Sequence, residues 1–172
     1  MPPRSYRWSA ANRMQSMADA GKAAGRVYLE TVLAGRTSPP PFASLLGMRL
    51  TGVGDGTAQF EMPVTTELYN PNDVVHGGAI TSLLDSAMGL AVLSTLREGE
   101  SFTTAELNVN FLRAVTAERG PLSCSGRVLH RGRQMVVAEA DCHDAGRQLV
   151  ARASSTNLIL VRRSPAAGAD AR

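Results

Sequence analysis

Apolar and polar residues follow two different periods along the chain. From residue 79 to about residue 96, apolar side chains recur at the three- and four-residue spacing of a helix, at Ile80, Leu83, Leu84, Ala87, Met88, Ala91 and Val92. Downstream, over residues 103–112, the period changes to two, which is typical of a half-buried strand. The pattern predicts one mostly apolar helix followed by a long strand on which Thr104 and Glu106 share a face.

The other segments predict further strands and a second helix. Strands are expected at residues 47–54, 57–63, 122–130, 134–143 and 148–161, because glycine-containing turns separate these runs. Residues 10–34 have the pattern of an amphipathic helix. Hairpin-linked strands with one inserted apolar helix favour an antiparallel sheet wrapped around that helix. We therefore predict an α+β fold with about five to six strands, a long central helix and an extra N-terminal helix.

The composition predicts one folded domain with two appendages. We expect a helical extension and proline-rich linker over 1–39, the domain itself over 40–162, and a disordered tail over 163–172, which is short, small and polar. Hydrophobic residues make up 44% of the 172, but no run is long enough for a transmembrane helix. The N-terminus lacks the apolar run of a signal peptide, so we expect a cytoplasmic protein with reduced cysteines.

Charge and motifs limit the chemistry. The formal net charge is +3 and aromatic residues are only 5%, which favours an anionic small ligand over nucleic acid. There is no Gly-x-Ser-x-Gly nucleophile elbow and no phosphate-binding P-loop motif. The histidine, cysteine and acidic residues lack the spacing of a metal site, so we predict neither a metal nor a separate cofactor.

One residue does not fit the apolar helix. Asp85 lies between Leu84 and Met88, where an unpaired carboxylate is costly to bury. The helix is preceded by a loop with turn-forming residues, and His76-Gly77-Gly78 stands where the helix is expected to begin. Asp85 is therefore the leading candidate for chemistry, as a general base or a nucleophile.

This stretch resembles the hotdog-fold acyl-CoA thioesterases of the PaaI-like, phenylacetate-pathway type. The family motif is an asparagine, a His-Gly-Gly six residues later, and an aspartate nine residues after the histidine; here these are Asn70, His76-Gly77-Gly78 and Asp85. Thr104 falls where the family often has a serine or threonine near the reacting water. The resemblance covers about residues 40–162 and implies a hotdog fold, an acyl-CoA substrate and a homodimer, often paired into a tetramer.

Attack of water on a thioester carbonyl needs a base, and it needs a hydrogen-bond donor for the oxygen on which negative charge develops. The N–H of Gly77, at the start of the helix, has no intrahelical partner and can act as an oxyanion donor. Asp85 is eight residues further along, about 12 Å at 1.5 Å per residue. We therefore expect a site shared across a two-fold interface, in which Asp85 and Thr104 of one subunit face Asn70, His76 and Gly77 of the other.

Each role has an alternative. Asp85 could be structural, His76 could fix the loop, Asn70 could brace the turn, and Thr104 could be an ordinary strand residue. For the substrate and its CoA part we expect contacts from Gly78, Arg131, Arg133, Met88 and Val92. The functional alternative is a non-catalytic acyl-CoA-binding or regulatory module on the same fold.

Overall fold

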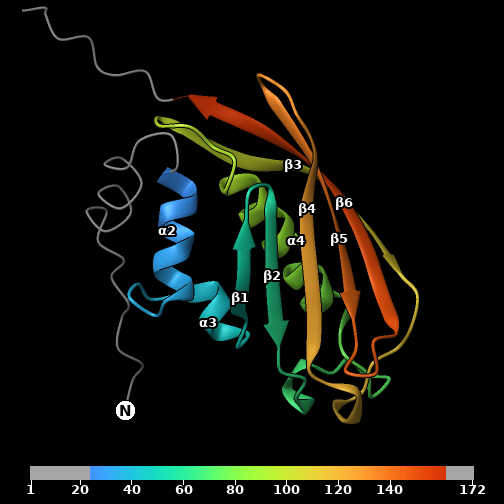
Figure 1. The fold of residues 1–172 in the computed structure, drawn as a ribbon. Coiled ribbons are helices and arrows are strands. Elements are labelled where there is room, and N and C mark those ends of the chain that lie inside the picture. Colours follow the sequence, from blue (N-terminus) through green and yellow to red (C-terminus); the bar gives the residue numbers. More distant parts are fainter. Residues whose placement is uncertain (1–23, 162–172) are drawn as a thin grey trace, which may run out of the picture.

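The computed structural model describes residues 24–161, in which an antiparallel sheet curves around one long helix, α4 (Gly77–Leu93) (Figure 1). Two short helices come first, α2 (Ala24–Leu33) and α3 (Pro41–Leu45). The sheet contains β1 (Arg49–Gly54), β2 (Thr57–Met62), β3 (Glu100–Phe111), β4 (Leu122–Arg131), β5 (Met135–His143) and β6 (Leu149–Val161). Short 3-10 turns span Thr66–Leu68 and Ala117–Arg119. The predicted α+β hotdog arrangement is confirmed.

The strand order places β3 at an edge. The six strands lie in the order β1-β2-β4-β5-β6-β3, and every neighbouring pair is antiparallel. β3 follows α4 directly in the chain but pairs only with β6 among the described strands. Its other side is thus an open edge among the described strands.

α4 forms the centre of the core. Its buried residues are Ile80, Leu83, Leu84, Ala87, Met88, Gly89, Ala91, Val92 and Leu93. Each large apolar side chain buried in this way contributes about 1.5–3 kcal/mol. The helix lies very close to β4, because a Cβ added at Gly126 would lie only 2.4 Å from the carbonyl carbon and oxygen of Ala87. Only glycine permits this approach of helix and strand.

The pairing of β3 with β6 contains a β-bulge. Thr104 pairs with Asn157 and Glu106 pairs with Thr156, so Ala105 is an extra residue between them. An extra residue shifts the side-chain alternation by one position. As a result, the hydroxyl of Thr104 contacts α4, whereas Glu106 is exposed and accepts a hydrogen bond from Thr156. The expectation that Thr104 and Glu106 share a face is therefore wrong.

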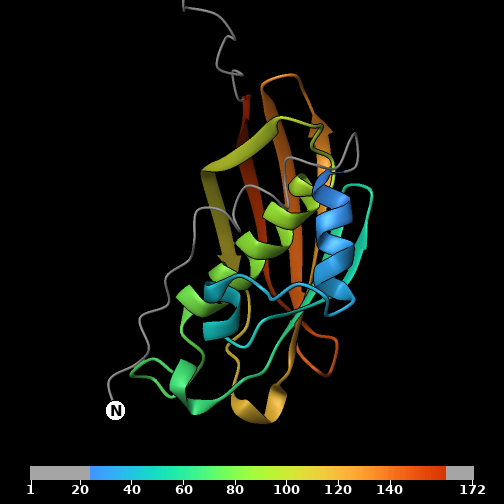
Figure 2. The same ribbon diagram turned by 90° about the vertical axis from the view of Figure 1, so that its left-hand side faces the viewer.

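α2 lies on the same side of the sheet as α4 (Figure 2) and packs beside β1. Leu29 is fully buried in this contact. A Cβ at Gly25 would lie 2.0 Å from the carbonyl oxygen of Leu93, so α2 closely approaches the C-terminal end of α4. The predicted N-terminal helix is thus seen over Ala24–Leu33, and its expected residues 10–23, like the tail 163–172, lie outside the described residues. Within residues 24–161, the helices are too short or too polar to cross a membrane.

Candidate active site

The loop before α4 is held by Asn70. Its Oδ1 accepts a hydrogen bond from the N–H of Asn72 (2.9 Å), and its own N–H donates to the carbonyl oxygen of Val74 (2.8 Å). Asp73, inside the same turn, has a φ of 56° in the left-handed region that aspartate and asparagine tolerate. Asn70 therefore braces the turn, which was the alternative to a place in the shared active site. A part of its amide in that site stays a prediction.

His76 is the N-cap of α4. Its Nδ1 accepts a hydrogen bond from the N–H of Gly78 (2.8 Å), and its backbone N–H donates to the carbonyl oxygen of Leu68 (2.7 Å). Because the accepting Nδ1 carries no proton, the neutral ring holds its proton on Nε2. The histidine thus joins the loop to the helix, and a direct part in chemistry stays a prediction.

Gly77 is the first residue of α4. Among residues 24–161 its N–H donates no hydrogen bond, as expected for the first helical residue, and it lies at the positive end of the helix dipole. Gly77 lines a pocket of about 380 Å³ together with Asn70, Ile80, Phe111 and Arg113. The Phe111 ring packs closely on it, since a Cβ at Gly77 would lie 3.1 Å from the ring Cζ. A free donor therefore lies beside a pocket.

Asp85, in the middle of α4, is in contact with Thr104 of β3. The hydroxyl of Thr104 donates to Oδ1 of Asp85 over 3.2 Å. The carboxylate is half-buried, and none of the ion pairs formed within the described part of the chain includes it. A carboxylate with one hydroxyl donor and no cation beside it is available to accept a proton or to attack a carbon.

The predicted site residues form two separate groups within one chain. One group, Asn70, His76 and Gly77, lies at the N-terminus of α4. The other is Asp85 in the middle of α4 with Thr104 of β3 beside it. Eight residues of helix separate Gly77 from Asp85, which is about 12 Å. One carbonyl group cannot contact both groups within a single chain.

Comparison with known proteins decides the family. The profile of the thioesterase superfamily matches residues 72–151, from the loop before α4 into β6. The proofreading thioesterase EntH of Cronobacter sakazakii is 30% identical over 124 residues, which cover 72% of this chain and 89% of that protein. This chain belongs to the thioesterase superfamily. It is a thioester hydrolase, which argues against the alternative of a non-catalytic module.

Solved structures of similar proteins share this fold. A conserved protein of Pseudomonas aeruginosa is 38% identical, with a TM-score of 0.66 and coverage of 71% of this chain and 95% of that one. The PaaI protein of Escherichia coli, from the phenylacetic acid degradation operon, is 24% identical, with a TM-score of 0.68 and coverage of 76% and 92%. That second likeness shows the fold alone. The resemblance to PaaI-like hotdog thioesterases is confirmed.

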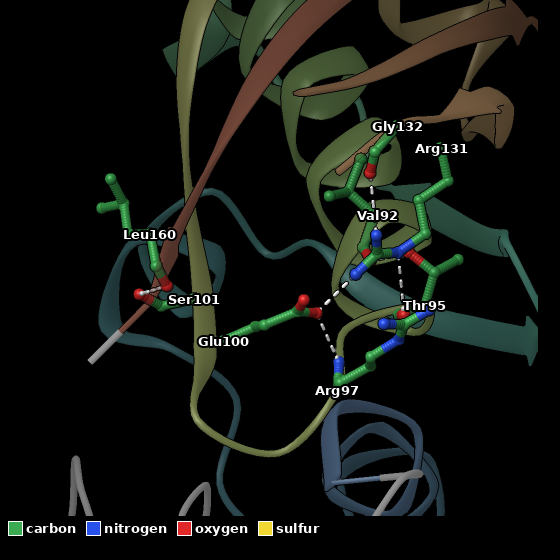
Figure 3. A network of polar contacts seen from close by, with 8 residues as sticks. All are labelled: Val92, Thr95, Arg97, Glu100, Ser101, Arg131, Gly132 and Leu160. Carbon is green, nitrogen blue, oxygen red and sulfur yellow. Dashed lines mark hydrogen bonds and ion pairs between the residues drawn. The ribbon is translucent and has the colours of Figure 1, made fainter. Parts of the chain in front are cut away.

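Arg131 of the thioesterase lies at the opposite end of α4 from Gly77. Its guanidinium donates to the carbonyl oxygens of Thr95 (3.3 Å) and Gly132 (2.9 Å) and forms an ion pair with Glu100, as Figure 3 shows. Burial alone raises the pKa of Glu100, but hydrogen bonds from the N–H of Arg97 and from Arg131 outweigh it and hold the pKa below its ordinary value. Arg131 thus links three chain segments.

The other predicted substrate contacts are spread over the molecule. Arg133 is exposed in the β4–β5 turn, and Gly78 lines a second pocket of about 470 Å³ that also includes His76. Met88 and Val92 are fully buried in the core of the chain. Contact of these residues, or of Arg131, with the substrate stays a prediction.

The two cysteines lie opposite each other on β4 and β5. Cys124 and Cys142 are paired in register, both are buried, and both are free thiols. Burial raises the pKa of Cys142 to about 12. A thiol that stays protonated is a poor nucleophile.

Sequence reasoning missed two residues near the candidate site. Arg113 lines the same pocket as Gly77, but in the sequence it is only one of many arginines. Asn157 is fully buried on β6 and accepts a hydrogen bond from Thr104. The available signal was its place between Ser155 and Ile159, at an inward position of an alternating strand.

Proposed function

We propose that this thioesterase hydrolyses acyl-CoA thioesters with an aryl or medium-chain acyl group to the free acid and CoA. The observation that carries the proposal is the 3.2 Å hydrogen bond from Thr104 to Asp85. It gives the one charged side chain of α4 a fixed hydroxyl partner, which suits a group that must activate or replace water.

Two routes are compatible with this carboxylate. As a general base, Asp85 takes a proton from water while the water oxygen attacks the carbonyl carbon; the C–S bond then breaks, and the CoA thiolate leaves and takes up a proton. As a nucleophile, a carboxylate oxygen attacks the carbonyl carbon, the thiolate leaves, and water hydrolyses the resulting anhydride. In both routes Thr104 orients the carboxylate or the water.

The negative charge that develops on the carbonyl oxygen needs a donor. In the proposal this donor is the N–H of Gly77. It has no hydrogen-bond acceptor among the described residues, and it lies at the positive end of α4. Because about 12 Å of helix separates Gly77 from Asp85, the catalytic pair comes from two subunits. The proposed enzyme is a homodimer with two shared sites. In this dimer the two subunits pair along the open edge of β3.

Two arginines are candidates for binding the phosphates of the CoA leaving group. Arg113 lines the pocket that includes Gly77 and Asn70, and the guanidinium group can donate two parallel hydrogen bonds to a phosphate. The adenosine phosphates of CoA are the corresponding acceptors in the proposed substrate. Arg133 is the second candidate for this contact, because it is exposed.

The test is thiol release from a panel of acyl-CoAs with short, medium, long and aryl acyl groups. The wild type is compared with Asp85→Asn, which keeps the size of the side chain and removes the base. Asp55→Asn, in the exposed β1–β2 turn, is the matched control for loss of one carboxylate. We expect Asp85→Asn to lose roughly a hundredfold or more in kcat.

The control should behave like the wild type, and both variants should keep the thermal stability of the parent. Retention of wild-type kcat in Asp85→Asn would remove Asp85 from the chemistry. Hydrolysis of other thioesters but of no acyl-CoA would contradict the proposed acyl-CoA substrate. The thioesterase assignment would remain in place.

A further inference from the structure

A buried amide lies behind the candidate base. Asn157 on β6 has no solvent-exposed surface, and its neighbour on the same face, Ser155, is 3% exposed. Burying an amide without hydrogen bonds costs several kcal/mol, so an asparagine at a core position needs a partner for each polar atom. Both Oδ1 and Nδ2 of Asn157 have a hydrogen-bond partner, and the partner of Oδ1 contacts Asp85 of α4.

Four polar groups form one continuous line from the sheet to the helix. Asn157 Nδ2 donates to Ser155 Oγ over 2.9 Å, and Asn157 Oδ1 accepts from Thr104 Oγ1 over 3.3 Å. Thr104 Oγ1 in turn lies 3.2 Å from Asp85 Oδ1. Thr104 and Asn157 are also directly paired in the β3–β6 register, just before the bulge at Ala105. The hydrogen bond from Thr104 to Asn157 therefore joins two directly paired strand residues.

The proton count shows how such a chain can work. The Thr104 hydroxyl has one proton, which can go either to Asn157 Oδ1 or to Asp85 Oδ1 but not fully to both. If the Asn157 amide turns by 180°, Nδ2 donates to Thr104, Oδ1 accepts from the Ser155 hydroxyl, and the Thr104 proton is free for Asp85. Each of the three hydrogen bonds then has one donor and one acceptor, and the line ends on the carboxylate.

The reverse arrangement fits the protonated carboxyl group. A carboxylic acid at Asp85 donates to Thr104, Thr104 donates to Asn157 Oδ1, and Asn157 Nδ2 donates to Ser155. The same four side chains therefore satisfy both forms of Asp85, with the direction of all three hydrogen bonds reversed. A base that takes up and returns a proton in each turnover needs this property.

We propose that Asn157 is a positioning residue, which acts through Thr104 to orient the hydroxyl on Asp85 in both of its protonation states. Its effect on turnover rests on the proposed function of Asp85, whereas the hydrogen-bonded chain itself does not. Asn157 contacts neither the substrate nor the reacting atoms in this proposal; it holds the group that does.

The kinetic test is a double-mutant cycle. Asn157→Leu and Thr104→Val replace each polar side chain by an apolar one of similar size. Thr156→Val is the control. It also removes a hydroxyl from β6, but that hydroxyl donates to exposed Glu106. We expect Asn157→Leu to lower kcat roughly tenfold, the upper end of the effect of one lost neutral hydrogen bond, with KM changed less than about twofold. The double variant should lose no more than Thr104→Val alone.

Independent losses that multiply in the double variant would overturn the proposal, as would an Asn157→Leu variant that alters only KM. Ser155→Ala serves as the second variant should Asn157→Leu unfold. It removes only the last partner in the chain and should lower kcat by a few fold. A wild-type kcat in folded Ser155→Ala would contradict a chain that extends to Ser155.

A spectroscopic test separates this proposal from the proposed function. In protein with ¹³C-labelled aspartate, the carboxyl resonance of Asp85 is identified by its loss in Asp85→Asn. It should move in both Thr104→Val and Asn157→Leu and stay in place in Thr156→Val. Because no substrate is needed, this result stands even if Asp85 proves unnecessary for hydrolysis, and an unmoved resonance in Asn157→Leu would rule out the chain.

Discussion

Arg131 and Glu100 form an ion pair that joins the β4–β5 hairpin to the start of β3. Their side chains are only 20% and 13% exposed. Arg131 also bonds the carbonyl oxygen of Thr95, just beyond α4, so the pair fixes the C-terminal end of the helix against the sheet. The helix that positions Asp85 is thereby anchored at the end opposite the proposed oxyanion donor.

We predict that Glu100→Gln destabilises the fold by about 1–3 kcal/mol at neutral pH, because a charged hydrogen-bond partner of Arg131 is lost. The pKa of Glu100 is lower in the folded protein than its ordinary value, so its stabilisation is present above that value and is lost as the pH falls through the folded pKa. The difference between wild type and variant should therefore shrink below about pH 4. Urea unfolding at several pH values measures it, with exposed Glu98→Gln as the control.

Gly77 can be tested by substitutions that separate its N–H from its missing side chain. Proline is tolerated at the first position of a helix and lacks the N–H, whereas alanine adds a Cβ and keeps it. We expect Gly77→Pro to lose about 10²–10³ in kcat, the effect of removing one oxyanion donor. Gly77→Ala should lose much less, since the added Cβ meets the exposed Phe111 ring. Equal losses in the two variants would point to crowding instead of a missing donor.

The shared site predicts complementation between inactive subunits. In a mixed dimer of Asp85→Asn and Gly77→Pro chains, one site carries both defects and the other carries neither. Random mixing should restore about a quarter of wild-type activity, because half of the dimers are mixed and each has one intact site. Activity assays after subunit exchange measure this. If both groups belonged to one chain's site, mixing would restore nothing.

Arg113→Gln should raise KM for acyl-CoA several-fold with little change in kcat, because it removes a cation from the pocket lined by Gly77. The same acyl group on N-acetylcysteamine, which lacks the phosphates, should show no such effect. Arg133→Gln tests the alternative contact in parallel. A KM effect in Arg133→Gln alone would place phosphate recognition at the β4–β5 turn.

Gly126→Ala should destabilise the domain by about 1–3 kcal/mol or more, because the new Cβ would overlap the backbone of Ala87 in α4. Exposed Ser125→Ala on the same strand is the control and should change little. Thermal and urea unfolding measure both. A well-folded, fully stable Gly126→Ala would mean that α4 can move away from β4 at little cost.

Local patterns in the sequence determined most of the fold. The helical period around Asp85 marked α4, and the period of two with its glycine turns marked the strands, because both depend on which side chains face the core. The misfit of Asp85 in an apolar helix and the spacing of Asn70, His76-Gly77-Gly78 and Asp85 marked the candidate site. The distance between Gly77 and Asp85 also followed from the sequence, because the rise of a helix is constant.

Contacts between distant segments were decided only by the tertiary structure. The bulge at Ala105 turned Thr104 towards Asp85, although strict alternation placed it beside Glu106; a bulge depends on pairing with β6, about fifty residues away, and leaves no local period. For the same reason the sequence did not reveal the bond between Thr104 and buried Asn157, or the use of Arg131 to hold the end of α4. Hydrogen-bond partners are set by where strands meet, which the order of residues along one strand does not contain.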